Sequence, residues 1–119
     1  MADETITIMA DFGSGPYAWK KLTCDGCASV GANIADATCG LSFLIGTSTQ
    51  LDDELAAWVV GFERGYDKPE FDWVSFHAQG IALATCLKRE VRDRYDVAYF
   101  PPHEDPLHGQ MPVFVIEAG

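Results

Sequence analysis

Hydrophobic side chains recur with helical spacing near the middle of the chain. They follow the i, i+4, i+7, i+8, i+11 pattern of a helix that buries one face. The positions are Leu51, Leu55, Trp58, Val59 and Phe62. Thr49 has the side chain of an N-cap, Asp52 follows it in a near capping-box arrangement, and Gly65 is typical of a helix end. We therefore expect a helix that begins at Thr49 and ends near Gly65.

A second helical pattern follows, from about Asp72 to Arg94. Its apolar stripe consists of Trp73, Phe76, Gly80, Leu83, Leu87 and Val91. Asp72 is suited to cap the first turn, and the cations of the last turns complement the helix dipole. Gly61 and Gly80 each lie inside a predicted helix, where a glycine costs about 1 kcal/mol relative to alanine. A close crossing of the two helices would explain both glycines.

Alternating hydrophobic and β-branched residues predict strands towards both ends of the chain. The predicted strands are Thr5–Met9, Tyr17–Leu22, Tyr95–Phe100 and Val113–Glu117. Residues 23–46 show no clear period, so we expect an irregular segment there. Within it, the short apolar piece Leu41–Ile45 fits either a strand or a turn of helix.

These elements predict a single α+β domain over residues 1–119. Two helices would pack on one face of a small three- to four-stranded, mostly antiparallel sheet, because that arrangement buries both apolar stripes. A chain of 119 residues is long enough for one such core and too short for two.

Net charge excludes some classes of partner. The chain carries 18 Asp and Glu against 8 Lys and Arg, a formal charge of −10. An acidic surface repels phosphate backbones and anionic lipids, so we expect neither a nucleic acid nor a membrane as partner. Four of the basic residues lie between Lys88 and Arg94, and the acidity elsewhere is spread along the chain.

The N-terminal residues bear on the cellular compartment. Asp3 and Glu4 stand where a secretory signal would carry cations, and no long apolar run follows them. We therefore expect a cytoplasmic protein whose four cysteines are thiols.

Cys24 and Cys27 form a CxxC motif. Two thiolates at this spacing can bind one metal ion or perform thiol–disulfide exchange. The sequence has no second CxxC or HxxxH to complete a zinc site, and a poor helix start follows the motif. We interpret the pair mainly as incidental small residues, with metal binding as the alternative, and we expect no cofactor.

Two histidines and two carboxylates gather in residues 102–108. His103, Glu104 and Asp105 are residue types that perform acid–base chemistry or bind a metal. The alternative, which we favour, is a proline-stiffened polar turn. A further histidine, His77, lies beside aromatic residues of the second predicted helix, and we interpret it as a partly buried packing residue.

The strand order suggests where a binding crevice would lie. If the first strand and the strand at residues 95–100 are parallel neighbours, their carboxyl ends open at one edge of the sheet. The loops that follow them would then face each other. The candidate crevice residues are Asp11, Phe12, Tyr17, Trp19, His103, Glu104 and Asp105.

Four segments resemble those of small acidic bacterial proteins of uncharacterised function. They are D-F-G-S-G-P-Y-A-W at residues 11–19, G-A-N-I-A-D-A at 31–37, F-D-W-V-S-F-H at 71–77 and Y-F-P-P-H-E-D-P at 99–106. The resemblance covers most of the chain and implies no catalytic residue. In size and acidity the chain is also similar to immunity proteins of bacterial toxin systems, which implies a protein partner.

Charge, size and the lack of a complete catalytic set favour a binding module over an enzyme. We expect a small acidic module that recognises, and in the immunity-like form inhibits, a basic protein. The alternative is a small enzyme or metal-binding protein that uses the His103, Glu104 and Asp105 loop or the Cys24 and Cys27 pair. A third interpretation is a domain that forms a homodimer.

Overall fold

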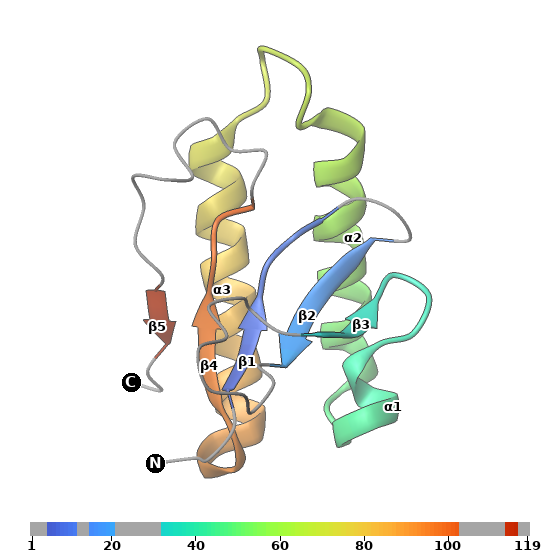
Figure 1. Ribbon diagram of the computed structural model, residues 1–119, viewed down its shortest axis with the longest axis vertical. Helices are drawn as coiled ribbons and strands as arrows, with labels where there is room; N and C mark the ends of the chain where they lie inside the picture. The colour runs from blue at the N-terminus through green and yellow to red at the C-terminus, as the bar shows by residue number, and fades with distance from the viewer. Residues whose placement is uncertain (1–4, 12–14, 21–31, 103–113, 117–119) are drawn as a thin grey trace.

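Two long helices cover one face of a five-stranded sheet in the computed structural model of the protein (Figure 1). The structure describes residues 5–11, 15–20, 32–102 and 114–116. The helices are α2, Thr49–Gly65, and α3, Trp73–Val91. A short helix, α1, spans Leu41–Ile45 and precedes them.

The sheet has the strand order β3-β2-β1-β4-β5 and is mixed. Its strands are β1 at Thr5–Ile8, β2 at Pro16–Lys20, β3 at Ala32–Asp36, β4 at Asp96–Tyr99 and β5 at Phe114–Ile116. The central pair, β1 and β4, runs parallel with Ile6 opposite Val97, whereas the other three pairs are antiparallel. Parallel neighbours need a long crossover connection, and here α2 and α3 lie within it.

The predicted α+β class is confirmed, but the predicted strand count is wrong. The sheet has five strands rather than three to four, because β3 lies inside the segment that we expected to be irregular. That strand reads A-N-I-A-D, so it offers one large apolar side chain and no alternation for a pattern to detect. The apolar piece at residues 41–45 is helical and adds a third helix.

The helix ends differ slightly from the predicted ones. The N-cap of α2 is Ser48 rather than Thr49, and its hydroxyl accepts a hydrogen bond of 3.2 Å from the Leu51 backbone N–H. Ser48 also donates from its backbone N–H and its hydroxyl to the carboxylate of Glu90, at 2.6 and 2.8 Å. The start of α2 is therefore bonded to the last turn of α3.

The third helix keeps its predicted start and loses its predicted end. Asp72 caps it and accepts from the Ser75 N–H at 3.1 Å, and this hydrogen bond holds the pKa of Asp72 below its usual value. The helix ends at Val91 rather than Arg94, because Arg92 takes a positive φ of 53° and a 3-10 turn over Arg92–Arg94 follows.

The core forms where the two helical stripes meet the sheet. On α2 all five predicted positions are buried. On α3 the buried residues are Phe76, Gly80, Ala84, Leu87 and Val91. Trp73 and Leu83, which we expected in the buried stripe, are only half-buried, and Ala84, the residue after Leu83, is buried instead.

The two helical glycines have different environments, and the predicted helix crossing explains neither. A Cβ at Gly80 would overlap the ring of Tyr99 and lie 2.6 Å from Cζ2 of Trp58. Gly80 thus leaves room for two aromatic rings between α3 and the sheet. A Cβ at Gly61 would meet nothing within 4 Å.

His77 has the packing role that the sequence predicts. It is half-buried, its Nδ1 lies 2.7 Å from the Tyr99 hydroxyl oxygen, and its ring contacts Trp73 and Phe76.

In the described parts of the chain, no helix is long and apolar enough to cross a membrane.

Substitution of the two glycines by alanine should shift stability in opposite directions. Gly61→Ala should raise the free energy of unfolding by about 1 kcal/mol, because alanine favours the helix and the added methyl group has open space. Gly80→Ala should lower it by about 1–3 kcal/mol, because the methyl group forces Tyr99 and Trp58 apart. Urea unfolding followed by circular dichroism measures both, and the same sign for both variants would contradict this packing.

Candidate functional site

The topology that the predicted crevice requires is present. Strands β1 and β4 are parallel neighbours, and the Phe100 N–H donates to the Ile8 carbonyl at 3.0 Å just beyond their ends. Both strands therefore end at the same edge of the sheet. Asp11 follows β1 there, and its backbone N–H donates to the Pro16 carbonyl at 3.1 Å.

Most of the predicted crevice residues lie outside the described part of the chain. These are Phe12, His103, Glu104 and Asp105, and the Cys24 and Cys27 pair also falls there. Trp19 is half-buried on β2 and donates from Nε1 to the Met9 carbonyl at 2.9 Å. Among the residues that the structure does describe, no three His, Cys, Asp or Glu side chains are grouped so that they could hold a metal ion.

Tyr17 takes part in a pocket that the sequence did not indicate. The pocket has a volume of about 220 Å³ and lies where β2, β3 and the start of α2 meet. We call it the carboxylate pocket, because three aspartates line it. Its lining residues are Tyr17, Asp36, Ala37, Thr38, Gly40, Thr49, Asp52, Asp53 and Ala56.

The Tyr17 hydroxyl is a buried polar group without a hydrogen bond. The side chain has no exposed surface, and its oxygen finds no hydrogen-bond partner among the described residues. Burial raises the pKa of this hydroxyl well above its usual value, and the negative charges of Asp52 and Asp36 raise it further. The Leu41 N–H has the opposite effect on this pKa, but it does not reach hydrogen-bond geometry. An unpaired buried hydroxyl is costly, so this group lowers the stability of the folded chain.

The carboxylate of Asp36 is fixed by a tight turn. One of its oxygens accepts from the Thr38 N–H at 2.8 Å, the Thr38 hydroxyl at 2.6 Å and the Cys39 N–H at 2.9 Å. These hydrogen bonds, with the Thr38 hydroxyl as the largest contributor, lower the pKa of Asp36. The group is therefore an anion held in a defined position.

Asp52 is fixed against the start of α1. Both of its oxygens lie 3.2 Å from the Ser42 backbone nitrogen, and the Ser42 hydroxyl also donates to the carboxylate. A Cβ at Gly40 would overlap the carboxylate of Asp52, so only glycine at position 40 allows this approach. Asp53, the third carboxylate, is exposed at the rim.

Exposed apolar side chains lie on the short helix that follows Gly40 in the chain. Phe43 is 85% exposed and Leu44 is 55% exposed, and both lie on α1, which begins next to Gly40. Large apolar side chains that remain exposed beside fixed charges are typical of protein-binding surfaces.

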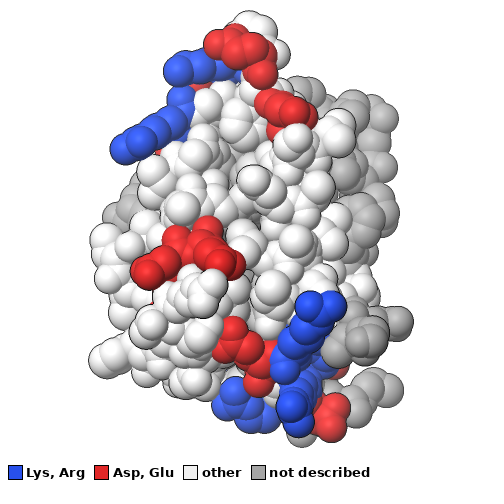
Figure 2. Space-filling view, turned by 180° about the vertical axis from the view of Figure 1, so that it is seen from behind, with Lys and Arg blue, Asp and Glu red and all other residues white. Residues whose placement is uncertain are grey.

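Charge on the opposite, helical face is distributed differently. Figure 2 shows Lys, Arg, Asp and Glu gathered towards the two ends of this face and in one group at its side, with an uncharged middle. The spread of Asp and Glu along the chain had suggested a uniformly acidic surface. The charge on this face is instead unevenly distributed.

No protein-family model, curated protein or solved structure matches the chain. One local signal for the carboxylate pocket is present in the sequence: the spacing of Asp36 and Thr38 is typical of an Asx turn, which presents a fixed carboxylate. The meeting of Tyr17 with Asp52 has no such local signal.

Removal of the hydroxyl from two tyrosines should have opposite effects on stability. Tyr17→Phe should raise the free energy of unfolding by about 1 kcal/mol, because it removes a buried group without a partner. Tyr99→Phe should lower it by about 1 kcal/mol, because it deletes the hydrogen bond to His77. Chemical unfolding of both variants measures this, and destabilisation by Tyr17→Phe would show that its hydroxyl is already satisfied.

Asp36 should make stability depend on pH. Its pKa is lower in the folded than in the unfolded chain, so its stabilisation is complete above the unfolded pKa and is lost as pH falls through the folded pKa. Asp36→Asn keeps an acceptor for Thr38 but removes the titration. The melting temperatures of wild type and variant should therefore converge between about pH 5 and pH 2. Thr38→Val should weaken the same dependence, and an unchanged gap at low pH would contradict the assignment.

Proposed function

We propose that the protein is a cytoplasmic binding module whose carboxylate pocket receives a cationic side chain, lysine or arginine, of a basic protein partner. The observation that carries this proposal is a pocket lined by three carboxylates, two of which are held in place by hydrogen bonds from neighbouring backbone N–H groups. Such a pocket supplies acceptors and negative charge, which an ammonium or guanidinium group matches with donors and positive charge.

The pocket is suited to a cation by its preorganisation. Asp36 and Asp52 are held by hydrogen bonds from Thr38, Cys39 and Ser42, so their orientation is set before a ligand enters. Preorganised acceptors lower the entropic cost of binding.

The surroundings support a protein rather than a free small cation as the ligand. Phe43 and Leu44 offer exposed apolar contacts on α1, which follows the pocket residue Gly40 in the chain, and interfaces combine such contacts with a few desolvated charges. The net charge of −10 would also speed the encounter with a basic protein by electrostatic steering. Inhibition of that partner, as in immunity proteins, is the form of this function that the sequence resemblance implies.

A pair of variants with equal charge separates site-specific recognition from general steering. Asp53→Asn changes the rim of the pocket, whereas Asp67→Asn makes the same change in the exposed turn between α2 and α3. Immobilised wild type should retain a basic protein from the native lysate at low salt and release it at high salt. We expect Asp53→Asn to weaken this binding about tenfold, the effect of one charged contact, and Asp67→Asn to leave it nearly unchanged. Equal losses in both variants would overturn the pocket as the binding site.

A titration with small cations tests the pocket directly. Butylguanidinium and butylammonium should shift the amide signals of Ala37 and Thr38 in a nitrogen–proton correlation spectrum, and neutral butylurea should not. Asp53→Asn should reduce the shifts, and Asp67→Asn should leave them unchanged. Equal shifts with butylurea, or none with either cation, would count against the proposal.

A further inference from the structure

The outer surface of the two long helices is almost free of charge along its middle. No Asp, Glu, Lys or Arg occurs from Leu55 to Phe62 or from Trp73 to Leu87. Several residues in these stretches are nevertheless exposed, namely Ala57, Gly61, Ala78, Gln79 and Ala82. A helix that faces water normally places charged residues there, so an uncharged face on a chain of charge −10 indicates a contact surface.

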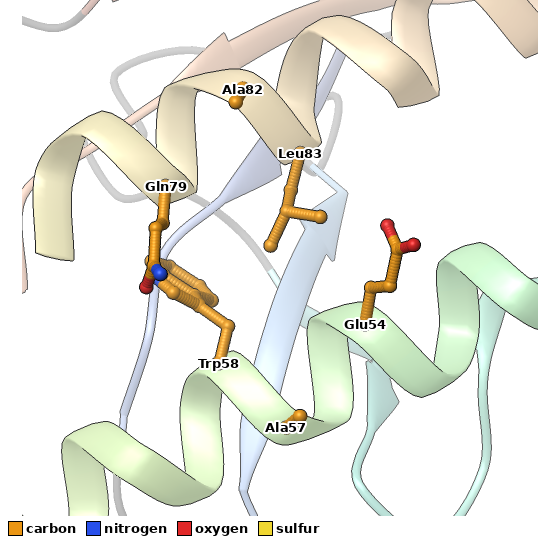
Figure 3. Close-up of a pocket in the computed structure, with 6 residues that line it drawn as sticks. All are labelled: Glu54, Ala57, Trp58, Gln79, Ala82 and Leu83. Carbon is orange, nitrogen blue, oxygen red and sulfur yellow. The ribbon is translucent and has the colours of Figure 1, made fainter.

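A groove runs along this face between α2 and α3. Its larger hollow has a volume of about 420 Å³ and is lined by Glu54, Ala57, Trp58, Gln79, Ala82 and Leu83. Figure 3 shows Trp58 and Leu83 directed into the space between the helices, with Glu54 towards one end. A second hollow shares Ala57, Trp58 and Gln79 with the first and continues to Asp72, so the two form one groove.

The floor of the groove is fixed. The ring of Trp58 stacks on that of Phe76 with centroids 4.7 Å apart and planes 9° apart. Its Nε1 donates to the Phe76 carbonyl at 3.0 Å. The apolar floor is therefore present before anything docks on it.

We propose that this groove is the interface of a homodimer, in which α2 packs antiparallel against α2 of a second copy across a two-fold axis. An antiparallel pairing centred at position 59 places Ala57 opposite the partner's Gly61, so the helices can approach closely. The same register places Glu54 opposite the partner's Arg64. Both side chains are exposed, and two-fold symmetry forms each pairing twice.

Electrostatics favours a second copy over the basic partner at this face. The basic partner would find carboxylates only towards the ends of the groove, at Glu54 and Asp72, whereas two acidic molecules repel each other least where neither carries charge. The outer face of α2 begins with the acidic Glu54 and ends with the basic Arg64. A docking helix with the same order of charges complements this face only when it runs in the opposite direction. Another α2 in the antiparallel orientation meets this condition with its own residues.

The dimer is tested by sedimentation equilibrium of the full chain, with charge reversals as probes. Glu54→Arg and Arg64→Glu should each weaken the dimer at least about tenfold, because each creates two like-charge pairs. The double variant should restore the dimer. Ala57→Arg should abolish it, whereas Val74→Arg, at an 81% exposed site that does not line the groove, should leave it intact.

Three outcomes would overturn the proposal. A monomeric wild type at millimolar concentration would exclude the dimer itself. A dimer that survives Ala57→Arg would place the interface elsewhere. A double charge-reversal variant that remains monomeric, with a native circular dichroism spectrum, would exclude the antiparallel register.

Discussion

The parallel pairing of β1 with β4 is the constraint on which the rest of the fold depends. Two parallel neighbours cannot be joined by a hairpin, so the chain between them must cross the sheet. Here it does so through α2 and α3, which contact the same sheet and lie on one face of it. Two consequences follow: the aromatic contacts of Trp58, Phe76 and Tyr99 fill the space beneath the helices, and the outer face of both helices remains open.

Two surfaces of different character lie along α2. The carboxylate pocket lies beside β2, β3 and α1, on the side of α2 away from α3. The uncharged groove lies on the side of α2 that faces α3. One helix thus contributes Asp52 and Asp53 to an acidic site and Ala57 and Trp58 to an apolar one. The cation binding and the association of two copies that we propose can therefore be altered by separate substitutions.

The long amphipathic elements could be predicted from the sequence, and the contacts between distant segments could not. The buried stripe of α2 and the Asp72 cap of α3 are local patterns, so periodicity and cap chemistry predict them. Strand β3 escapes detection because its small residues carry no alternation. From the sequence, we expected Gly80 to mark a close crossing of the two helices. The rings that need its space, those of Trp58 and Tyr99, belong to distant segments, so the residues around Gly80 do not reveal them. The carboxylate pocket is likewise non-local, since Tyr17 and Asp52 meet only after the sheet and α2 have packed.

The bond between Ser48 and Glu90 joins residues 42 positions apart and links the beginning of α2 to the last turn of α3. If either helix unwinds at this end, the hydrogen bonds between Ser48 and Glu90 are lost and the other helix is no longer held there. The two helices consequently behave as one cooperative unit rather than as two independently opening segments. In amide hydrogen exchange, their protected amides should open together, with a shared free energy and a shared response to a change at Glu90.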